Sequence, residues 1–287
     1  MKRILLLLAI ALTARAEKIV TLDALNDTAE IFDTKTKTAT RIATKATPVA
    51  SAFVGNELYI LARDARVLQH IGGANIAVAQ DPAFLGQSEG KLYVYSRSLG
   101  MLEEIAHDRV TRRASIPRFA SDLEIAGTSA YLVYPREGRI RIVDLKTMGV
   151  RGEVTVGAVP VDLAVAGGGT ALTARILAVA DPSAKRVWLT EETQSTAKAV
   201  ARGFLRGFLG LGLFGNRSSQ FPTGVDRVWI RGKRWFAYDT SSGTLYSFTR
   251  KKSSVLARNV TLNDFYFTDE GVTLRSGTSV AQTTSDE

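Results

Sequence analysis

A unit of four short segments recurs about every 34 to 47 residues along this chain, and this repeat constrains the fold more than any other feature. The second segment of each unit is apolar, rich in aromatic or β-branched residues, and followed at once by turn-forming residues. The copies are Leu58-Tyr59-Ile60-Leu61, Leu92-Tyr93-Val94-Tyr95, Tyr131-Leu132-Val133-Tyr134, Ile176-Leu177-Ala178-Val179 and Trp235-Phe236-Ala237-Tyr238. Alternating third segments and polar turns, such as Asp33 to Thr36, complete the pattern. A repeat of this length built from strands is typical of a β-propeller, in which each unit forms a four-stranded blade.

The number of blades follows from the first strands. Proline suits the entry of a strand, because it has no N–H to donate, and the first strands open near Pro48, Pro82, Pro117, Pro160 and Pro222. First strands are expected at 49–54, 83–87, 118–125, 161–166, 224–230 and 262–267. Residues 18–42 resemble strands two to four of a blade, so pairing them with 262–267 would close six blades into a ring without exposed edges. The segment from Gly271 to Arg275 is predicted as a surplus second strand, which keeps seven blades as the alternative. The sequence therefore predicts one all-β propeller over residues 17–287, with six blades favoured.

Two segments resemble known propeller repeats. The run from Pro160 to Val165, together with the later Lys185-Arg186-Val187-Trp188, resembles the YVTN-type repeats of secreted proteins. The run from Ala237 to Tyr246 is similar to a quinoprotein-type blade motif. Such propellers serve as enzymes, scaffolds and binding modules, so the resemblance implies a fold and no particular activity. Because a single blade carries the quinoprotein-like motif, a remnant blade without a cofactor is expected.

Residues 1–16 have the pattern of a secretory signal peptide. Lys2 and Arg3 precede an apolar stretch from Ile4 to Leu12, and Ala14-Arg15-Ala16 supplies the small-residue cleavage pattern. We expect cleavage before Glu17 and a secreted or periplasmic protein. An uncleaved anchor is the alternative. The sequence has no cysteine, so no disulfide is expected.

The charge balance does not single out a nucleic-acid partner. The full sequence carries a formal net charge of +9, but its basic residues are scattered over the predicted turns. An exported protein rarely meets nucleic acid, so we expect none as a ligand and interpret these charges mostly as a solvated surface.

Catalytic motifs are few. The sequence has two histidines, His70 and His107, so a zinc site of the usual His and Cys type would need both histidines and carboxylates in addition. Propeller lactonases, which resemble this chain in architecture, bind a divalent ion through carboxylates at first-strand ends. The corresponding candidates here are Asp122, Asp162, Asp226 and Asp264. They could hold a metal for a hydrolase, or they could accept hydrogen bonds from backbone N–H groups.

One stretch, 195–220, departs from the repeat and is predicted as a short helical or irregular insertion. Lys198, Arg202 and Arg206 are spaced by four residues, so a helix would place them on one face. Phe204 and Phe208, offset by two positions, would lie on the opposite face. A small cationic amphipathic helix of this kind suits an anionic membrane or a groove on a partner. The alternative is an insertion that folds back and buries its apolar residues on the propeller.

These features favour a non-catalytic binding or scaffold module that contacts a protein partner or a membrane through residues 197–215. The alternative is a metal-dependent, lactonase-like hydrolase. No cofactor is expected.

Overall fold

The computed structural model describes the chain as an all-β protein, and the β-propeller fold predicted from the repeat is confirmed. The described residues are 18–157, 159–166, 175–192, 217–231, 234–249, 253–262, 265–268, 271–274 and 279–280. Apart from one 3-10 turn, η1 (Pro135–Glu137), the regular elements in these residues are strands. None of the described segments forms a helix with the length and apolar character needed to cross a membrane.

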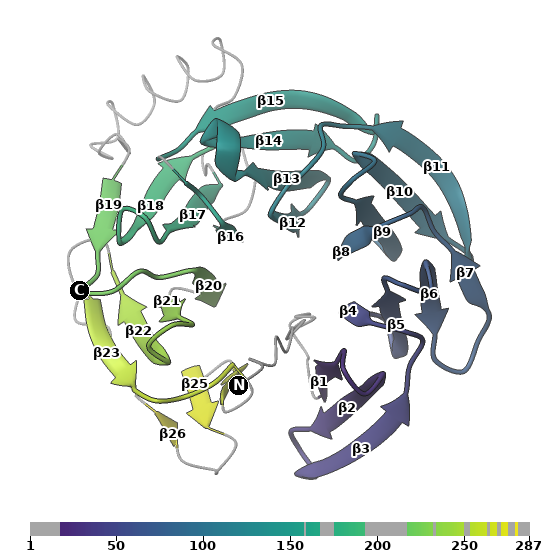
Figure 1. The fold of residues 1–287 in the computed structure, drawn as a ribbon, viewed down its shortest axis with the longest axis horizontal. Coiled ribbons are helices and arrows are strands. Elements are labelled where there is room, and N and C mark those ends of the chain that lie inside the picture. The colour runs from purple at the N-terminus through teal and green to yellow at the C-terminus, as the bar shows by residue number, and fades with distance from the viewer. Residues whose placement is uncertain are drawn as a thin grey trace. The chain divides into compact units, whose positions relative to one another are not determined.

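The described chain divides into two compact units. The first unit comprises the described residues up to 128 together with 145–149, and the second comprises 129–144 and the described residues from 150 onward. Figure 1 shows the strands of both units as successive antiparallel sheets, in which strands that are neighbours in sequence are hydrogen-bonded neighbours.

Five of the sheets have four strands each. The first is β4 (Pro48–Val54), β5 (Glu57–Ala62), β6 (Val67–His70) and β7 (Asn75–Ala77). The second is β8 (Pro82–Ser88), β9 (Lys91–Ser96), β10 (Met101–Ala106) and β11 (Arg109–Ser115). The third is β12 (Asp122–Ala126), β13 (Ser129–Tyr134), β14 (Arg139–Asp144) and β15 (Gly149–Thr155). The fourth is β16 (Asp162–Ala166), β17 (Ile176–Asp181), β18 (Arg186–Glu191) and β19 (Arg217–Gln220). The fifth is β20 (Arg227–Arg231), β21 (Arg234–Asp239), β22 (Thr244–Phe248) and β23 (Ser253–Ala257).

The two ends of the described chain form three-stranded sheets. They are β1 (Lys18–Asp23), β2 (Thr28–Asp33) and β3 (Thr38–Ala43), and β24 (Phe265–Thr268), β25 (Gly271–Leu274) and β26 (Ser279–Val280). The predicted pairing of 262–267 with 18–42 is wrong for the described residues, because β24 pairs with β25, the surplus strand of the sequence pattern. A short local hairpin therefore replaces the long-range pairing. Counting the two end sheets as one blade gives six blades, and counting them separately gives seven.

The turn from Asp33 to Thr36 forms as the sequence predicts. Oδ1 of Asp33 accepts hydrogen bonds from the backbone N–H groups of Lys35 at 2.9 Å and Thr36 at 3.0 Å, which holds the β2–β3 turn. Three predicted first strands start too early in the sequence: β20 begins at Arg227 instead of 224, β24 at Phe265 instead of 262, and β12 at Asp122 instead of 118. Before β12, residues 116–121 form a loop. Tertiary hydrogen bonds to this loop, described below, take the place of strand pairing.

Each unit has its own apolar core. In the first unit Leu61, Leu68 and Val94 are fully buried in one cluster, and Leu61 lies opposite Leu68 in the β5–β6 register. In the second unit Val187 and Val225 are fully buried in another cluster. Val187 belongs to β18, and Val225 lies in the loop that precedes β20.

Candidate functional site

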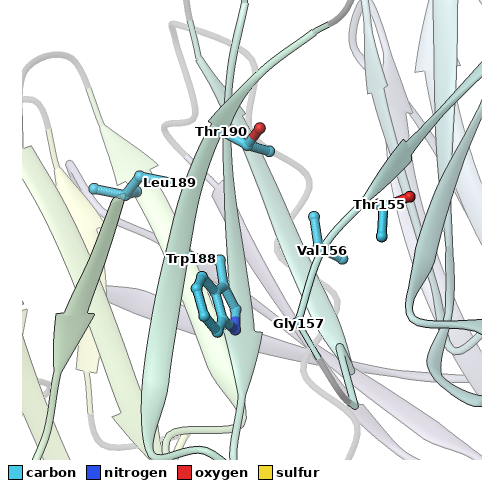
Figure 2. Close-up of a pocket in the computed structure, with 6 residues that line it drawn as sticks. All are labelled: Thr155, Val156, Gly157, Trp188, Leu189 and Thr190. Carbon is cyan, nitrogen blue, oxygen red and sulfur yellow. The ribbon is translucent and has the colours of Figure 1, made fainter. Parts of the chain in front are cut away.

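A small cavity lies in the second unit between the end of β15 and strand β18. It has a volume of about 150 Å³ and is lined by Thr155, Val156, Gly157, Trp188, Leu189 and Thr190. Figure 2 shows the indole nitrogen of Trp188 on the side of the ring that faces Gly157. The lining is mainly apolar and carries no ionisable side chain, so the cavity suits a small apolar group and offers no acid, base or nucleophile.

Asp181, the last residue of β17, fixes the Trp188 side of the cavity. This fully buried carboxylate accepts a hydrogen bond from Nε1 of Trp188 at 3.3 Å through Oδ2 and one from the hydroxyl of Ser183 at 2.6 Å through Oδ1. Burial by itself would raise the pKa of Asp181, but its hydrogen bonds outweigh burial and lower that pKa below its usual value. The indole also packs so closely on the backbone that a Cβ at Gly157 would lie 2.6 Å from its Cε2 atom. The tryptophan is therefore held rigidly.

A charged cluster around Glu192 joins the end of β18 to the beginning of β15. The buried Glu192 follows β18, forms an ion pair with Arg151 of β15, and accepts a hydrogen bond from the Tyr131 hydroxyl at 2.9 Å. Arg175 lies 3.6 Å from the same carboxylate and donates to Ser129 Oγ at 2.9 Å. Burial, followed by the negative charge of Glu192, raises the pKa of Tyr131 to about 12. Because both arginines neutralise the carboxylate, this cluster is suited to holding β15 against the end of β18.

The first unit contains a second cluster of the same kind. Glu104 of β10 is buried and accepts hydrogen bonds from Arg112, Thr111, Lys91 and Tyr93. The hydrogen bonds from Arg112 are the largest cause that lowers the pKa of Glu104 to about 2. Burial, followed by the charge of Glu104, raises the pKa of Tyr93 to about 12. Arg112 also donates to the backbone carbonyls of Leu145 at 2.8 Å and Lys146 at 2.7 Å, so it ties β11 to the β14–β15 turn.

A third cluster, also in the first unit, involves His70. Its ring stacks on Tyr59, with ring centroids 4.4 Å apart, and its Nδ1 lies 3.3 Å from Asp108. The Tyr59 hydroxyl donates toward Asp108 at 3.0 Å. Tyr59, Tyr93 and Tyr131 are each the third residue of the second strand in their sheet. The repeat thus places a tyrosine hydroxyl beside a carboxylate in three successive sheets.

Three of the four predicted metal-ligand candidates lie among the described residues. Oδ2 of Asp162 accepts a hydrogen bond from the backbone N–H of Val228 at 2.7 Å, and Oδ1 of Asp226 accepts one from the backbone N–H of Thr240 at 3.1 Å. Asp122 accepts one from the backbone N–H of Leu123 at 2.8 Å. Within the described ranges, no three His, Cys, Asp or Glu side chains gather where they could hold a metal ion. Asp264 lies outside those ranges, so the metal hypothesis stays a prediction.

The predicted contact residues Lys198, Arg202, Phe204, Arg206 and Phe208 also lie outside the described residues, as does the predicted signal peptide at 1–16. The last part of the stretch predicted to interrupt the repeat is, however, a strand. β19 covers Arg217–Gln220 and completes the fourth sheet by pairing with β18. Only the part of the stretch that precedes Arg217 departs from the repeat.

Comparisons with known proteins agree on the propeller fold. The chain is similar to a Neurospora crassa Pan2 WD40 domain, with a TM-score of 0.65 and 14% identity over 93% of this chain and 84% of that one. It is similar to a chain of the mitotic checkpoint complex, with a TM-score of 0.64 and 11% identity over 94% and 83%. It is also similar to a catalytically inactive virginiamycin B lyase from Staphylococcus aureus with quinupristin, with a TM-score of 0.66 and 9% identity over 92% and 89%. At these identities the likeness shows the fold alone.

No protein-family model matches the sequence, and no curated protein matches it either. The YVTN-type and quinoprotein-type resemblances therefore stay predictions.

Sequence reasoning missed the buried carboxylates Glu104 and Glu192 and the cavity beside Trp188. The tyrosine at the third position of successive second strands was a visible signal for polar partners, because a buried tyrosine hydroxyl usually finds one. Which carboxylate would meet each hydroxyl is set by tertiary packing and has no local signal.

Proposed function

We propose that this protein is an exported, non-catalytic β-propeller that acts as a binding or scaffold module. Its contact element is residues 197–215, and it binds a partner protein or an anionic membrane surface through them. Proteins of this fold occur in assemblies such as the mitotic checkpoint complex, which supports a protein partner. The basic and aromatic residues from Lys198 to Phe208 supply the chemistry for either surface.

The main support for this proposal is the length of the connection between strands β18 and β19. β18 and β19 are hydrogen-bonded neighbours, with Leu189 opposite Arg217, so residues 192–216 join two paired strands. In the other four-stranded sheets the corresponding connections are short: 71–74, 107–108, 145–148 and 249–252. A short turn suffices to join paired antiparallel strands. The extra length is therefore not needed for the sheet and is available for another role.

The test is to replace residues 194–215 by Asn-Gly, which keeps Glu192 and both strands. Since the β18–β19 pairing does not depend on the removed residues, we expect the free energy of unfolding to change by no more than about 0.5 kcal/mol. We expect the variant to lose co-sedimentation with phosphatidylglycerol vesicles, or to lose its partner in a pull-down from the producing organism.

A quadruple variant tests whether the basic and aromatic side chains, and not merely the length of the connection, are needed for binding. Replacing Arg202, Phe204, Arg206 and Phe208 by serine should abolish the same binding, whereas alanine at Ser195 and Thr196 should preserve it. If Phe204 and Phe208 are core residues instead, each truncation should cost about 3–5 kcal/mol. Such a loss of stability, or unchanged binding, would contradict the proposal.

A further inference from the structure

The first unit carries two exposed apolar side chains, Phe119 and Leu99, on neighbouring loops. Phe119 is 56% exposed and Leu99 is 39% exposed. They lie on two loops, 97–100 and 116–121, which are hydrogen-bonded to each other. The N–H of Phe119 donates to the carbonyl of Arg97 at 3.0 Å, and the N–H of Ile116 donates to the carbonyl of Gly100 at 2.7 Å. Both apolar side chains are therefore exposed on one pair of connected loops.

Buried and partly buried groups hold both loops in place. The hydroxyl of the fully buried Tyr95 donates to the carbonyl of Pro117 at 2.8 Å and accepts from the N–H of Ala120 at 3.3 Å, so it grips the chain on both sides of Phe119. In the other loop, Oδ2 of Asp81 accepts a hydrogen bond from the N–H of Ser98 at 3.0 Å. A partner that binds here meets preformed loops, which lowers the entropy cost of association.

The backbone of Phe119 is strained. Its φ is +64°, in the left-handed region that a bulky side chain rarely adopts and that glycine or asparagine accepts more easily. The stability of the fold does not account for an aromatic residue here, because the conformation disfavours it and much of its side chain is exposed. Strained residues of this kind cluster at binding sites.

Two cationic residues lie on the same two loops: Arg118 precedes Phe119 in sequence, and Arg97 accepts the backbone hydrogen bond from Phe119. Arg97 and Arg118 are both exposed, and the Arg118 stem crosses Gly100, because a Cβ on that glycine would lie 2.9 Å from Cγ of Arg118. No carboxylate in the described part of the chain forms an ion pair with either guanidinium, whereas Arg112 and Arg113 on neighbouring β11 are paired with Glu104 and Glu103. The two loops thus present positive charge that is free to pair with an acidic partner.

We propose that Arg97, Leu99, Arg118 and Phe119, together the Phe119 surface, dock an acidic segment of a partner protein. An apolar side chain of that segment packs on Phe119 and Leu99, while its carboxylates pair with Arg97 and Arg118. Aromatic and arginine side chains together are typical of the residues that dominate binding energy. This surface lies apart in sequence from residues 192–216, and its role does not depend on theirs.

The probe is a fluorescein-labelled peptide with one phenylalanine flanked on both sides by Asp and Glu, titrated with the full chain and followed by fluorescence anisotropy. Two matched peptides replace the phenylalanine by alanine or the acidic residues by lysine. We expect both to bind at least about tenfold more weakly than the probe. Added salt should weaken binding of the probe, because exposed charge pairs are screened.

Phe119→Asn separates a binding role from a structural one. It removes the ring but suits the left-handed backbone, so the melting temperature should stay the same or rise while the probe binds at least about tenfold more weakly. Arg97→Ser with Arg118→Ser should weaken binding and flatten its salt dependence. Leu25→Asn, which changes a leucine that is 68% exposed on a different turn, is the matched control and should leave binding unchanged.

Several results would overturn the proposal. The proposal is wrong if the acidic probe does not bind measurably, if the lysine peptide binds equally well, or if Phe119→Asn binds the probe with unchanged affinity. A clear fall in the melting temperature of Phe119→Asn would make the ring structural. Vesicles of phosphatidylglycerol that bind in a Phe119-dependent manner, with no binding of the probe, would assign the surface to a membrane instead.

Discussion

At the scale of single residues, Glu104 shows how a buried charge is made stable in this fold. Its carboxylate is 3% exposed and is surrounded by Arg112, Lys91, Thr111 and Tyr93. Removing its charge by Glu104→Gln leaves Arg112 with a poorer acceptor. Arg112 is 37% exposed, so water replaces part of the lost interaction. We therefore expect the free energy of unfolding to fall by about 2–3 kcal/mol, less than for a fully buried pair.

Urea denaturation measures this free energy, and Glu153→Gln is the matched control. Glu153 pairs with Arg139 at the surface, so the control should cost less than about 1 kcal/mol. Equal costs would contradict the proposed importance of burial.

The same carboxylate predicts a dependence of stability on pH. The pKa of Glu104 is lowered from 4.5 to about 2 in the folded protein. A lowered folded-state pKa means that its stabilising contribution is complete above the unfolded pKa of 4.5 and is lost as the pH falls toward 2. Glu104→Gln should therefore lose less stability than the wild type over that interval.

At the scale of elements, the strands were largely predictable and their partners were not. Second strands such as Leu58 to Leu61 are marked by local apolar runs and turn formers, and β5 forms where expected. The start of β12 was mistaken because Tyr95 holds residues 117 and 120 in a loop, a contact that the local sequence does not show. Pairing of 262–267 with 18–42 was mistaken because a local hairpin, β24–β25, was available. The candidate cavity was missed for the same reason, since it needs two separate strands.

A glycine substitution tests how tightly β18 packs against the end of β15. At Gly157 an added Cβ would lie 2.6 Å from Cε2 of Trp188 and 2.7 Å from Oδ2 of Asp181. Gly157→Ala should therefore push the indole away and cost about 1–3 kcal/mol, measured by urea denaturation followed by tryptophan fluorescence. In Gly152→Ala, within β15, the new methyl group meets no atom within 4 Å. This control should be neutral or stabilise by up to about 1 kcal/mol, because alanine restricts the unfolded chain. A neutral Gly157→Ala would show that Trp188 is free to move.

At the scale of the whole molecule, the repeat predicts the propeller fold but not the partner. The cellular compartment decides which partners the protein can meet. Residues 1–16 carry Lys2, Arg3 and Arg15, so their removal lowers the net charge from +9 to +6. Because the sequence has no cysteine, the protein can enter an oxidising compartment without forming disulfides.

Export is tested on protein recovered from the producing cell. Mass spectrometry should find Glu17 at the N-terminus of the exported protein, because Ala14-Arg15-Ala16 precedes it as the cleavage pattern. A reducing agent should leave the melting temperature unchanged. Intact Met1 on protein confined to the cytosolic fraction would contradict export, and it would move the search for a partner of the Phe119 surface and of residues 197–215 to the cytosol. A variant with Arg in place of Leu6 and Leu8 interrupts the apolar stretch and should retain residues 1–16 and stay inside the cell, whereas Ile in both places should be exported and cleaved normally.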